Sequence, residues 1–567
     1  MRSDKSMRRI AGACVLLLLL LVGVWNLTPA PKFDEDFSSA TYSSDGRLMA
    51  ARVASDQQWR FPIEGELSKK YIKALVEFED RRFFYHFGID PVGIARAFRD
   101  NIRSGKIVSG GSTITMQLAR LTLGHRERSY LNKFVEMLTA IKLEVLYSKS
   151  EILRLYAQYA PFGGNLVGVQ SASVRYLGRF GERLTWADAA LLAILPNRPG
   201  VLHLDSKRKA LRERRDRFLD HLIRHDVIDR DTGYLAKKEP LPSVRFQVPQ
   251  YGTHIIDAIG GSGGVTTIDF ELQSKAQDVL IRHAERLAHN QIFNSAMVIA
   301  DVESGDILAY HGNAVVPGTE DDNAGYVDCA RSKRSTGSIL KPLLFAKAME
   351  DRQFFPKELL PDVPVRLGGF RPENFDRSYR GVVPADVALA QSLNVPAVNV
   401  LSHYGVERFH SDLVGLGFEL HPDPWHYGLS MILGGAESSL FEIVGLYRAM
   451  AKGLRDGEHS DVVKLSTGLN FHLNEADTEK SNPIFHQSEI AASALWLMAD
   501  ALELVTRPET HSWLEDDEGR RRFAWKTGTS YGFRDGWALG FDRQYVVGVW
   551  VGNADGTGRQ HLTGRRA

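Results

Sequence analysis

The feature that most constrains this chain is an apolar segment close to its N-terminus. Residues 10–31 contain no charged side chain, and residues 15–22 are leucines flanked by valines. Because an α-helix rises 1.5 Å per residue, about 18 to 20 such residues span the roughly 30 Å hydrocarbon core of a bilayer. We therefore predict a transmembrane anchor at 10–27, with the rest of the chain folded on one side of a membrane.

The charge before this segment predicts its orientation. Residues 1–9 carry four basic side chains and one acidic side chain, and such a flank keeps the N-terminus in the cytoplasm. A cleaved signal peptide has the same two regions, but residues 27–30 fit a small-x-small cleavage site poorly. An uncleaved anchor is the favoured interpretation, and the bulk of the chain is then exported.

Composition limits the classes of protein that fit. The chain has 567 residues, enough for three or four domains of about 150 residues. A net charge of +1 excludes nucleic-acid binding through bulk positive charge, and 44% hydrophobic residues exclude a mostly disordered chain. Two cysteines, Cys14 and Cys329, cannot build a disulfide framework or a thiolate metal site, and we expect Cys329 to be a small half-buried side chain.

Local patterns divide the exported part into segments. A basic helix is predicted at 207–225, glycine- and proline-rich stretches follow it, and a hairpin at 296–310 and three strands between 523 and 551 indicate an α/β domain. The predicted parts are a cytoplasmic tail at 1–9, the anchor at 10–27, a linker at 28–55, a helical domain at 56–205, a basic helix and linker region at 206–290, and an α/β domain at 291–567.

One carboxylate in the helical domain lies where a general base could work. Ile72, Leu75 and Val76 form an apolar stripe at helical spacing, and Glu79 takes the next position of that stripe. A carboxylate on an apolar face tends toward a raised pKa, which suits a general base. The alternative interpretation is structural, with Glu79 paired to an arginine such as Arg82.

A second signal follows at Gly110-Gly111-Ser112-Thr113. Two glycines and a Ser/Thr pair before an apolar-periodic helix leave backbone N–H groups free to bind a phosphate or pyrophosphate. The Gly-Lys-Ser/Thr ending of a nucleotide P-loop is absent, which disfavours ATP.

These two signals resemble the first two motifs of the peptidoglycan glycosyltransferases, which are mainly helical, lysozyme-like domains that polymerise lipid II. The matching segments are residues 79–88, read as EDRRFFYHFG, and residues 110–120, read as GGSTITMQLAR. Residues 133–136, 156–169 and 191–199 match the family's later motifs in the same order.

The resemblance assigns roles to individual residues. Glu79 is expected to deprotonate the attacking 4-hydroxyl of the acceptor lipid II, while Glu136 assists the departing pyrophosphate and Lys133 balances charge. By helical spacing alone, Lys133 and Glu136 would be a surface pair opposite an apolar stripe within 131–138. Further substrate-binding positions implied by the family are Asp80, His86, Ser112, Thr113 and Gln117. The chain departs from the family's usual glutamine, arginine and asparagine at Met116, Asn132 and Gln158.

Three short elements in the second domain indicate a different chemistry. Ser338 and Lys341 are three residues apart, so on a helix the amine shares a face with the hydroxyl and can take its proton. Pro342 is tolerated only if this helix has just begun, which puts Ser338 near its positive end. Ser392-Leu393-Asn394 begins 54 residues after Ser338, and Lys526-Thr527-Gly528-Thr529 begins a further 134 residues on.

This set resembles the acyl-serine transferases that bind penicillin. By position, Ser338 attacks the D-Ala-D-Ala carbonyl and Lys341 activates it, while Ser392 relays protons. The N–H groups of Ser338 and Thr529 would form the oxyanion hole. The substrate-binding positions that this resemblance implies are Asn394, Lys526, Thr527, Gly528 and Thr529.

Both sets behind one anchor are similar to the class A, bifunctional penicillin-binding proteins, and residues 371–376 match their 1C branch. The implied fold is multidomain: a transmembrane helix, a mainly α lysozyme-like glycosyltransferase domain, and an α/β, serine β-lactamase-like transpeptidase domain with an antiparallel sheet. The implied function is a peptidoglycan synthase that polymerises lipid II and acylates Ser338 with stem peptides for crosslinking. The family continues into a closing helix after the position of Ala567, so we expect a transpeptidase domain that lacks this helix and has a bare sheet face.

The resemblance also implies partners and a compartment. The expected partners are lipid II, nascent glycan strands, D-Ala-D-Ala stem peptides, β-lactams and other cell-wall synthesis proteins, at the bacterial inner membrane with the bulk in the periplasm and with no nucleic acid. No cofactor is required, a divalent cation is possible in the glycosyltransferase site, and no His-Glu-x-x-His or similar metal-ligand spacing occurs. The alternatives are a glycosyltransferase with an inactive penicillin-binding half, a D,D-carboxypeptidase or β-lactamase using the same serine, and a non-catalytic β-lactam sensor or scaffold.

Overall fold

The fold was obtained as a computed structural model. The described residues are 23, 25–26, 28–105, 110–124, 129–181, 183–196, 208–242, 245–261, 263–472, 487–505 and 523–567. The chain divides into two compact units, one made of residues up to 39 with 52–248 and the other of 40–51 with 249–567. The predicted anchor at 10–27 lies outside the described residues except for 23, 25 and 26, and none of the described helices is long and apolar enough to cross a bilayer.

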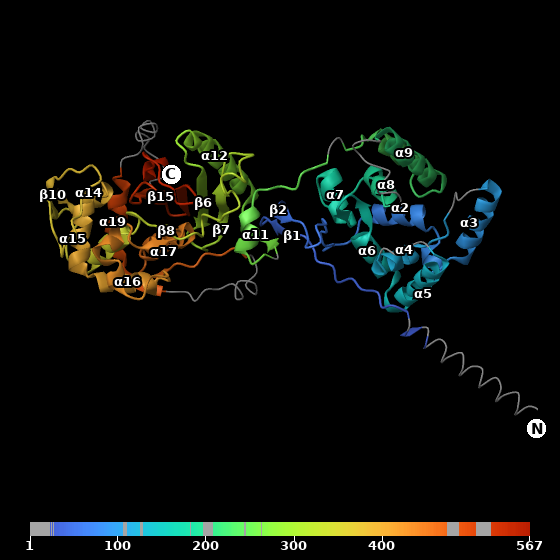
Figure 1. The fold of residues 1–567 in the computed structure, drawn as a ribbon, viewed down its shortest axis with the longest axis horizontal. Helices are drawn as coiled ribbons and strands as arrows, with labels where there is room; N and C mark the ends of the chain where they lie inside the picture. The colour runs from blue at the N-terminus through green and yellow to red at the C-terminus, as the bar shows by residue number, and fades with distance from the viewer. Residues whose placement is uncertain are drawn as a thin grey trace, which may run out of the picture. The chain divides into compact units, whose positions relative to one another are not determined.

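The first unit is mainly helical, as predicted (Figure 1). Its central helix is apolar on nearly all sides, so seven of its nine residues are buried, and four other helices pack against it. The elements are α2 (Lys69–Glu79), η1 (Phe83–Tyr85), α3 (Pro91–Ser104), α4 (Ile114–Thr122), α5 (Tyr130–Leu146), α6 (Lys149–Tyr159), β3 (Pro161–Gly163), β4 (Leu166–Val167), α7 (Val169–Leu177), the central α8 (Trp186–Ile194), α9 (Arg208–Arg224) and α10 (Arg230–Lys238).

Local sequence explains where several of these helices begin. Thr113 accepts a hydrogen bond from the N–H of Met116 and caps α4. Ser148 with Glu151, and Thr185 with Asp188, form reciprocal capping boxes at the starts of α6 and α8. The glycine and Ser/Thr signals in the sequence therefore mark real helix N-termini.

The predicted basic helix and linker region, 206–290, does not stand apart from the two units. The basic helix is confirmed as α9 and packs on α8 and α10 in the first unit, whereas α11 (Thr253–Ala258) and α12 (Phe270–Ala288) belong to the second. The prediction that the glycine-rich stretch is a linker is wrong, because this stretch forms the strand β5 (Gly263–Val265). This strand pairs in parallel with β1 (Ser39–Tyr42), which also lies beside β2 (Leu48–Arg52). Its pairing partner lies more than 200 residues earlier, which no local pattern shows.

The second unit is built on a five-stranded sheet in the order β14-β15-β16-β6-β7, and every neighbouring pair is antiparallel. The predicted hairpin and the three late strands are confirmed as β6 (Asn294–Asp301), β7 (Ile307–Ala314), β14 (Ala524–Thr529), β15 (Asp535–Phe541) and β16 (Tyr545–Gly552). The pairing of β16 with β6 thus joins strands from residues 294–314 and from residues 524–552 in one sheet.

Helices cover both faces of this sheet (Figure 1). Alternate residues of β6 point to opposite sides: Val298 joins the main core with α17 (Leu440–Asp456), whereas Ile299 packs with Ala276 of α12. The other elements of the unit are β8 (Arg334–Ser335), α13 (Lys341–Glu350), β9 (Leu359–Asp362), β10 (Gly381–Pro384), α14 (Ala385–Ala390), α15 (Asn394–Tyr404), α16 (Val406–Gly415), η2 (Pro424–His426), η3 (Gly428–Leu433), β11 (Glu437–Ser438), β12 (Val462–Ser466), β13 (Gln487–Ala491), α19 (Ala492–Glu503) and η5 (Gly564–Arg566).

The residues after β16 correct the expectation of a bare sheet face. In the fully described segment 553–567, the one helical element is the 3-10 helix η5, which packs on β14 and β15. Leu562 is fully buried with Leu287 of α12. A Cβ at Gly564 would lie only 2.5 Å from the backbone oxygen of Gly528, so this glycine permits the close approach. Short irregular chain covers this part of the face without an α-helix.

Candidate active sites

Glu79 ends α2 and is half-buried at one end of a hydrogen-bonded chain. Nε2 of Gln117, on α4, donates to Oε2 of Glu79 at 2.7 Å, and the hydroxyl of Tyr156, on α6, donates to Oε1 of Gln117 at 3.1 Å. The side chain of Arg82 lies 3.7 Å from Asp90, so the arginine of the structural alternative has another acidic partner. Three helices therefore converge to orient the Glu79 carboxylate.

Two buried tyrosines lie close enough to this carboxylate to be affected by its charge. Burial, together with the negative charge of Glu79, raises the pKa of both Tyr71 and Tyr156. Both hydroxyls therefore stay protonated at neutral pH. They add hydroxyl dipoles but no negative charge to the surroundings of Glu79.

Asp80 and His86 bind each other instead of facing solvent. Nε2 of His86 lies 3.1 and 3.0 Å from the two carboxylate oxygens of Asp80, and each side chain is only 4% exposed. Asp80 also accepts a hydrogen bond from the N–H of Ile114, while Thr113 donates to the carbonyl of Gly88 at 2.6 Å. These contacts fasten the loop after α2 to the start of α4, which is a positioning task.

Glu136 overturns the expectation drawn from helical spacing. It is 8% exposed, whereas Leu131 of the predicted apolar stripe is 72% exposed, so the surface-pair prediction is wrong. The reason is tertiary: α5 packs on α4, from which Arg120 reaches the Glu136 carboxylate with Nε at 2.7 Å. Lys133 completes the cluster from α5 itself, with Nζ 2.9 Å from the same carboxylate.

The cluster around Glu136 carries net positive charge. Burial would raise the pKa of the Glu136 carboxyl, but hydrogen bonds from Arg120 and Lys133 hold it below its ordinary value. Nζ of Lys133 also donates to Oγ of Ser112 at 2.8 Å, which joins the cluster to the glycine-serine turn before α4. Two cations, one carboxylate and a helix start make a site suited to a pyrophosphate.

The three residues that differ from the family pattern lie on the same helices as residues of the predicted glycosyltransferase motifs. Met116 is buried in the core of the unit. Gln158 is also buried, accepting from the N–H of Ile63 and donating to the carbonyl of Phe61, so it fastens an incoming segment to α6. Asn132 lies in the first turn of α5. Met116 and Gln158 therefore act in packing and leave the hydrogen-bonded chain to Glu79 intact.

In the second unit, Ser338 lies in the turn that leads into α13, and Lys341 is the first residue of that helix. This confirms the prediction that the helix has only just begun at Pro342. Gly337, with φ of 53°, lets the turn approach β14 closely, since a Cβ there would lie 2.9 Å from the backbone N of Thr529. The first and third predicted elements are therefore in contact.

Lys341 is fully buried and connects the first element to the second. Its Nζ donates to the carbonyls of Ser392 and Leu393 at 2.9 and 3.1 Å and to Oδ1 of Asn394 at 2.8 Å. Burial, with a further contribution from the charge of Lys526, lowers the pKa of Lys341 well below its ordinary value. Lys341 therefore gives up its proton more readily than an exposed lysine, and in its neutral form it can keep only two of these three donated hydrogen bonds.

Lys526 connects the third element to the second. Its Nζ donates to Oγ of Ser392 at 2.6 Å and to the carbonyl of Thr527 at 2.5 Å. Burial lowers the pKa of Lys526 to about 7. Ser392 has φ of 60°, a left-handed conformation that is uncommon outside glycine and directs this hydroxyl toward Lys526.

The third element lies on an edge strand. β14 is at one end of the sheet order and carries the predicted Lys526-Thr527-Gly528-Thr529 segment, of which both threonines are half-buried. An edge strand offers N–H and C=O groups that an extended peptide can pair with. The arrangement therefore combines a serine, two buried amines and a peptide-binding edge.

Comparisons with known proteins match each of the two units to a family. The family model described as "Transglycosylase" matches residues 45–223, and the one described as "Penicillin binding protein transpeptidase domain" matches residues 295–564. Penicillin-binding protein 1C of Escherichia coli is 34% identical over 554 residues, which cover 97% of this chain and 69% of that protein. The chain belongs to the class A penicillin-binding proteins.

Further relatives support this family. Penicillin-binding protein 1F of Bacillus subtilis is 28% identical over 92% of this chain and 74% of its own length. The crystal structure of penicillin-binding protein 1A from Haemophilus influenzae has the same fold, with a TM-score of 0.51 and 17% identity over 94% of this chain and 91% of that one. As a class A penicillin-binding protein, the chain is a bifunctional peptidoglycan glycosyltransferase and transpeptidase.

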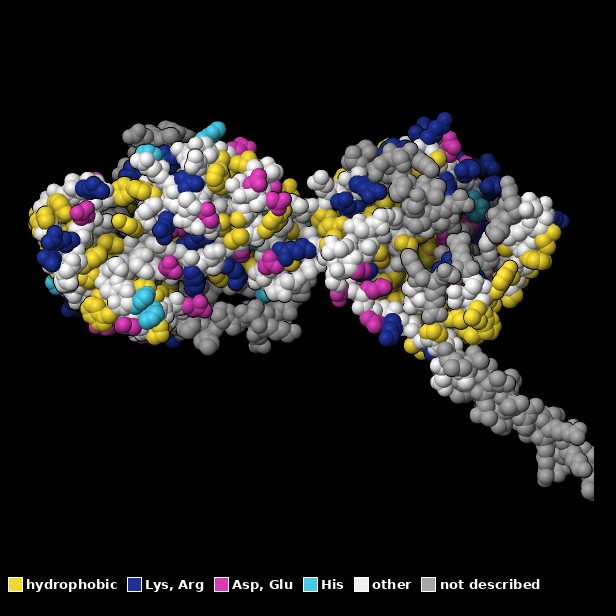
Figure 2. All heavy atoms as spheres, viewed as in Figure 1, with side chains coloured by type: hydrophobic (Ala, Val, Ile, Leu, Met, Phe, Trp, Pro, Cys, Tyr) yellow, Lys and Arg dark blue, Asp and Glu magenta, His cyan; other side chains and the backbone are white. Residues whose placement is uncertain are grey.

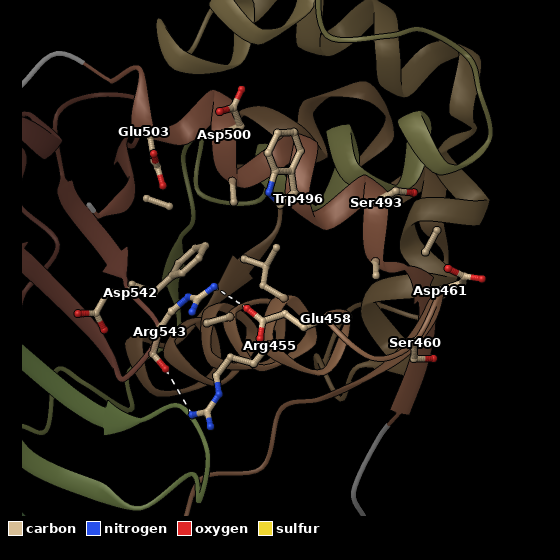
Figure 3. A pocket seen from close by; sticks show the side chains of 18 of the residues that line it. Arg455, Glu458, Ser460, Asp461, Ser493, Trp496, Asp500, Glu503, Asp542 and Arg543 are labelled. Atoms are coloured by element: carbon tan, nitrogen blue, oxygen red, sulfur yellow. Dashed lines mark hydrogen bonds and ion pairs between the residues drawn. The ribbon is translucent and has the colours of Figure 1, made fainter. Parts of the chain in front are cut away.

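A cavity of about 910 Å³ lies elsewhere in the transpeptidase unit of this penicillin-binding protein (Figure 3). Trp496, Asp500 and Glu503 line it from one face of α19, and an ion pair between Arg543 and Glu458 crosses it. None of the predicted site residues line this cavity. The predicted transpeptidase residues are instead joined to one another through the contacts of Lys341 and Lys526 with Ser392.

Metal-binding geometry is sparse in the described residues. One group of three side chains could hold an ion there, formed by Glu77, His221 and His225. Arg81 already lies 3.0 Å from Glu77 and 3.4 Å from His221, so a guanidinium occupies the place of a cation. Cys329 is a free, fully buried thiol, and burial raises its pKa to about 12.

Two residues of this penicillin-binding protein contact the predicted site residues but were not predicted from the sequence. Arg120 ends the matched segment 110–120 and contacts Glu136. Its position one helical turn after Gln117 places it on the same helix face, which could have indicated this role. Asn374, in the stretch that matches the 1C branch, lies against the second catalytic element through a hydrogen bond to Asn394. Its position in space could not be obtained from spacing.

Proposed function

We propose that Glu79 is the general base of the glycosyltransferase. The observation that carries this assignment is the chain from Tyr156 through Gln117 to Glu79, because it fixes one carboxylate oxygen and the orientation of the other. The acceptor's 4-hydroxyl gives its proton to Glu79 as its oxygen attacks the donor sugar. The sugar's bond to pyrophosphate breaks in the same step.

The departing pyrophosphate is assigned to the cluster of Arg120, Lys133 and Ser112. Positive charge placed where negative charge develops stabilises the transition state more than the ground state. Glu136 stays ionised, since its pKa is lowered, so it orients the two cations and does not donate a proton. This refines its expected assistance to the pyrophosphate into a positioning role.

Ser338 is assigned as the nucleophile of the transpeptidase and Lys341 as its base. Neutral Lys341 has two N–H groups for three oxygen partners, so its lone pair can turn to the serine hydroxyl. The Ser338 oxygen then bonds to the penultimate D-Ala carbonyl, and the terminal D-Ala leaves with a proton relayed through Ser392. Lys526 and Thr527 hold the substrate carboxylate, and the N–H groups of Ser338 and Thr529 receive the oxyanion.

No resident cofactor is part of this proposal. A divalent cation in the glycosyltransferase site would need free carboxylate oxygens, but Glu136 accepts from Arg120 through both of its oxygens and from Lys133 through one of them. The donor set therefore fits an anionic ligand better than a cation. No step of the reaction is routed through a metal.

The proposed location is the bacterial inner membrane, with a cytoplasmic N-terminus and both units in the periplasm. The apolar segment 10–27 and its basic flank support this location. Exposed apolar side chains on two helices of the glycosyltransferase unit also favour contact with lipid, which a lipid-linked substrate requires (Figure 2). These side chains are Ile94, Phe98 and Ile102 of α3 and Tyr130, Leu131 and Phe134 of α5.

The test uses the purified full-length protein in detergent with lipid II and a fluorescent penicillin. We expect Glu79→Gln to lower the rate of glycan polymerisation by roughly 100-fold or more while penicillin labelling stays unchanged. Glu77→Gln is the matched control, because Glu77 lies on the same helix but pairs with Arg81. Wild-type polymerisation by Glu79→Gln would show that another group is the base.

A further inference from the structure

Asn374 uses the whole hydrogen-bonding capacity of its side chain. It is 2% exposed, and its Oδ1 accepts from the N–H groups of Asn394 at 2.9 Å and Val395 at 3.3 Å. Its Nδ2 donates to Oδ1 of Asp362 at 2.7 Å and to the carbonyl of Ser378 at 2.8 Å. Two acceptor positions and two donor positions are all that an amide offers.

The donor side of this amide is fixed to a rigid support. Asp362 is fully buried at the end of β9, and its Oδ2 accepts from the N–H of Arg380 at 3.0 Å. The guanidinium of Arg380 lies 3.7 Å from the same carboxylate. Asn374 therefore cannot rotate without breaking contacts to a buried carboxyl group.

The acceptor side replaces a missing helix cap. The N-cap residue of α15 is Leu393, whose side chain cannot accept a hydrogen bond, and the helix has no cap of its own. Asn374, 20 residues earlier in the chain, supplies the oxygen for the first two N–H groups. The start of α15 is therefore held by a separate segment of the chain.

What this cap holds is the second catalytic element. Asn394 accepts a hydrogen bond from Nζ of Lys341 through Oδ1 and donates one through Nδ2 to the carbonyl of Glu373. Residues 373 and 374 therefore bind Asn394 through both its side chain and its backbone N–H. Ser392, two residues before, is in the left-handed conformation that directs its hydroxyl toward Lys526. Such a conformation persists only where its surroundings hold it in place.

We propose that Asn374 is a positioning residue for the acylation of Ser338. By capping α15 from outside, it sets where Asn394 meets the Lys341 amine and where the Ser392 hydroxyl meets Lys526. Misplacement of catalytic groups by about 1 Å costs on the order of 100-fold in rate. The proposal rests on the assigned roles of Ser338 and Lys341.

The experiment measures acylation of the full-length protein by a fluorescent penicillin across pH 6 to 9. It separates the dissociation constant of the non-covalent complex from the first-order acylation constant. Asn553→Ala is the matched control, because Asn553 is 4% exposed in the same unit and its side chain bonds only to backbone groups away from α15. Melting temperatures report the general loss of stability in each variant.

We expect Asn374→Ala to lower the acylation constant roughly 10- to 100-fold and to change its pH profile, with a smaller effect on the dissociation constant. Asn553→Ala should lower the melting temperature similarly but keep the acylation constant within about twofold of wild type. Wild-type acylation and pH profile in Asn374→Ala, or an equal acylation loss in Asn553→Ala, would overturn the proposal. A wild type that never labels would instead contradict the assigned role of Ser338.

A second comparison serves if Asn374→Ala does not fold. Asn374→Asp alone places two carboxylates in contact with each other, so acylation should fall. The exchange variant Asp362→Asn with Asn374→Asp restores one amide-to-carboxylate hydrogen bond between the two positions and keeps the cap oxygen. We expect the exchange to recover acylation to within several-fold of wild type. An exchange that acylates no faster than Asn374→Asp would contradict the positioning role.

Discussion

Lys526 Nζ donates a hydrogen bond to Oγ of Ser392 across 2.6 Å, although 134 residues separate the two in the chain. The same serine accepts from Lys341 through its backbone carbonyl. Two buried amines therefore meet on one residue, and the charge of Lys526 lowers the pKa of Lys341 further. Two like charges so close to each other are disfavoured, and we assign the charge that binds a carboxylate to Lys526.

Penicillin binding should therefore weaken as the pH rises through neutrality. Burial lowers the pKa of Lys526 to about 7, so its charge is lost as the pH rises above that value. We expect the dissociation constant of the non-covalent complex to rise by up to about tenfold per pH unit above 7. The acylation constant should not fall over the same range. Stopped-flow labelling from pH 6 to 9 separates the two constants.

Lys526→Arg provides the control for this pH dependence. An arginine keeps its charge at every pH in the range, so the dissociation constant of this variant should not change with pH. A flat dissociation constant in the wild type would show that Lys526 is not the carboxylate-binding cation.

Replacing Glu136 with glutamine should slow polymerisation without changing its pH profile. The carboxylate is ionised because Arg120 and Lys133 hold its pKa low, and glutamine leaves these two cations without a counter-charge. We expect a loss of roughly tenfold or more that is equal from pH 6 to 9, measured by lipid II polymerisation. A loss that varies with pH would mean that Glu136 exchanges a proton during the reaction. Glu151→Gln, in the exposed capping box of α6, is the control.

Ser338→Ala should abolish the penicillin adduct and leave polymerisation at the wild-type rate. The nucleophile and the glycosyltransferase residues lie in different compact units. Mass spectrometry of the labelled wild type should find the adduct on the peptide that contains Ser338. An adduct on a Ser392 peptide, or labelling of Ser338→Ala, would contradict this assignment.

Asp80→Asn should destabilise the glycosyltransferase unit and reduce polymerisation with it. Asparagine keeps the shape but loses the charge-assisted hydrogen bonds to His86 and to the N–H of Ile114. We expect a loss of about 1–3 kcal/mol in the free energy of unfolding. Denaturant titration of the first unfolding transition measures it. Asp100→Asn, whose partner is the exposed neighbouring Arg99, should change the free energy of unfolding by less than about 0.5 kcal/mol.

The sequence by itself determined the local features of both catalytic sets. The three-residue step from Ser338 to Lys341 and the capped helix start after Thr113 depend on neighbouring residues, so periodicity and capping rules are enough to find them. The resemblance that these motifs carry led to the family, which the comparisons then confirmed.

Tertiary structure alone decided which side chains meet. Helical spacing put Glu136 on the surface, but Arg120 from another helix buries it. The cap of α15 comes from Asn374, and the partner of Ser392 comes from a strand at the far end of the chain. Such contacts form between segments that local periodicity treats as independent, because burial and hydrogen bonding depend on distance in space and not on distance along the chain.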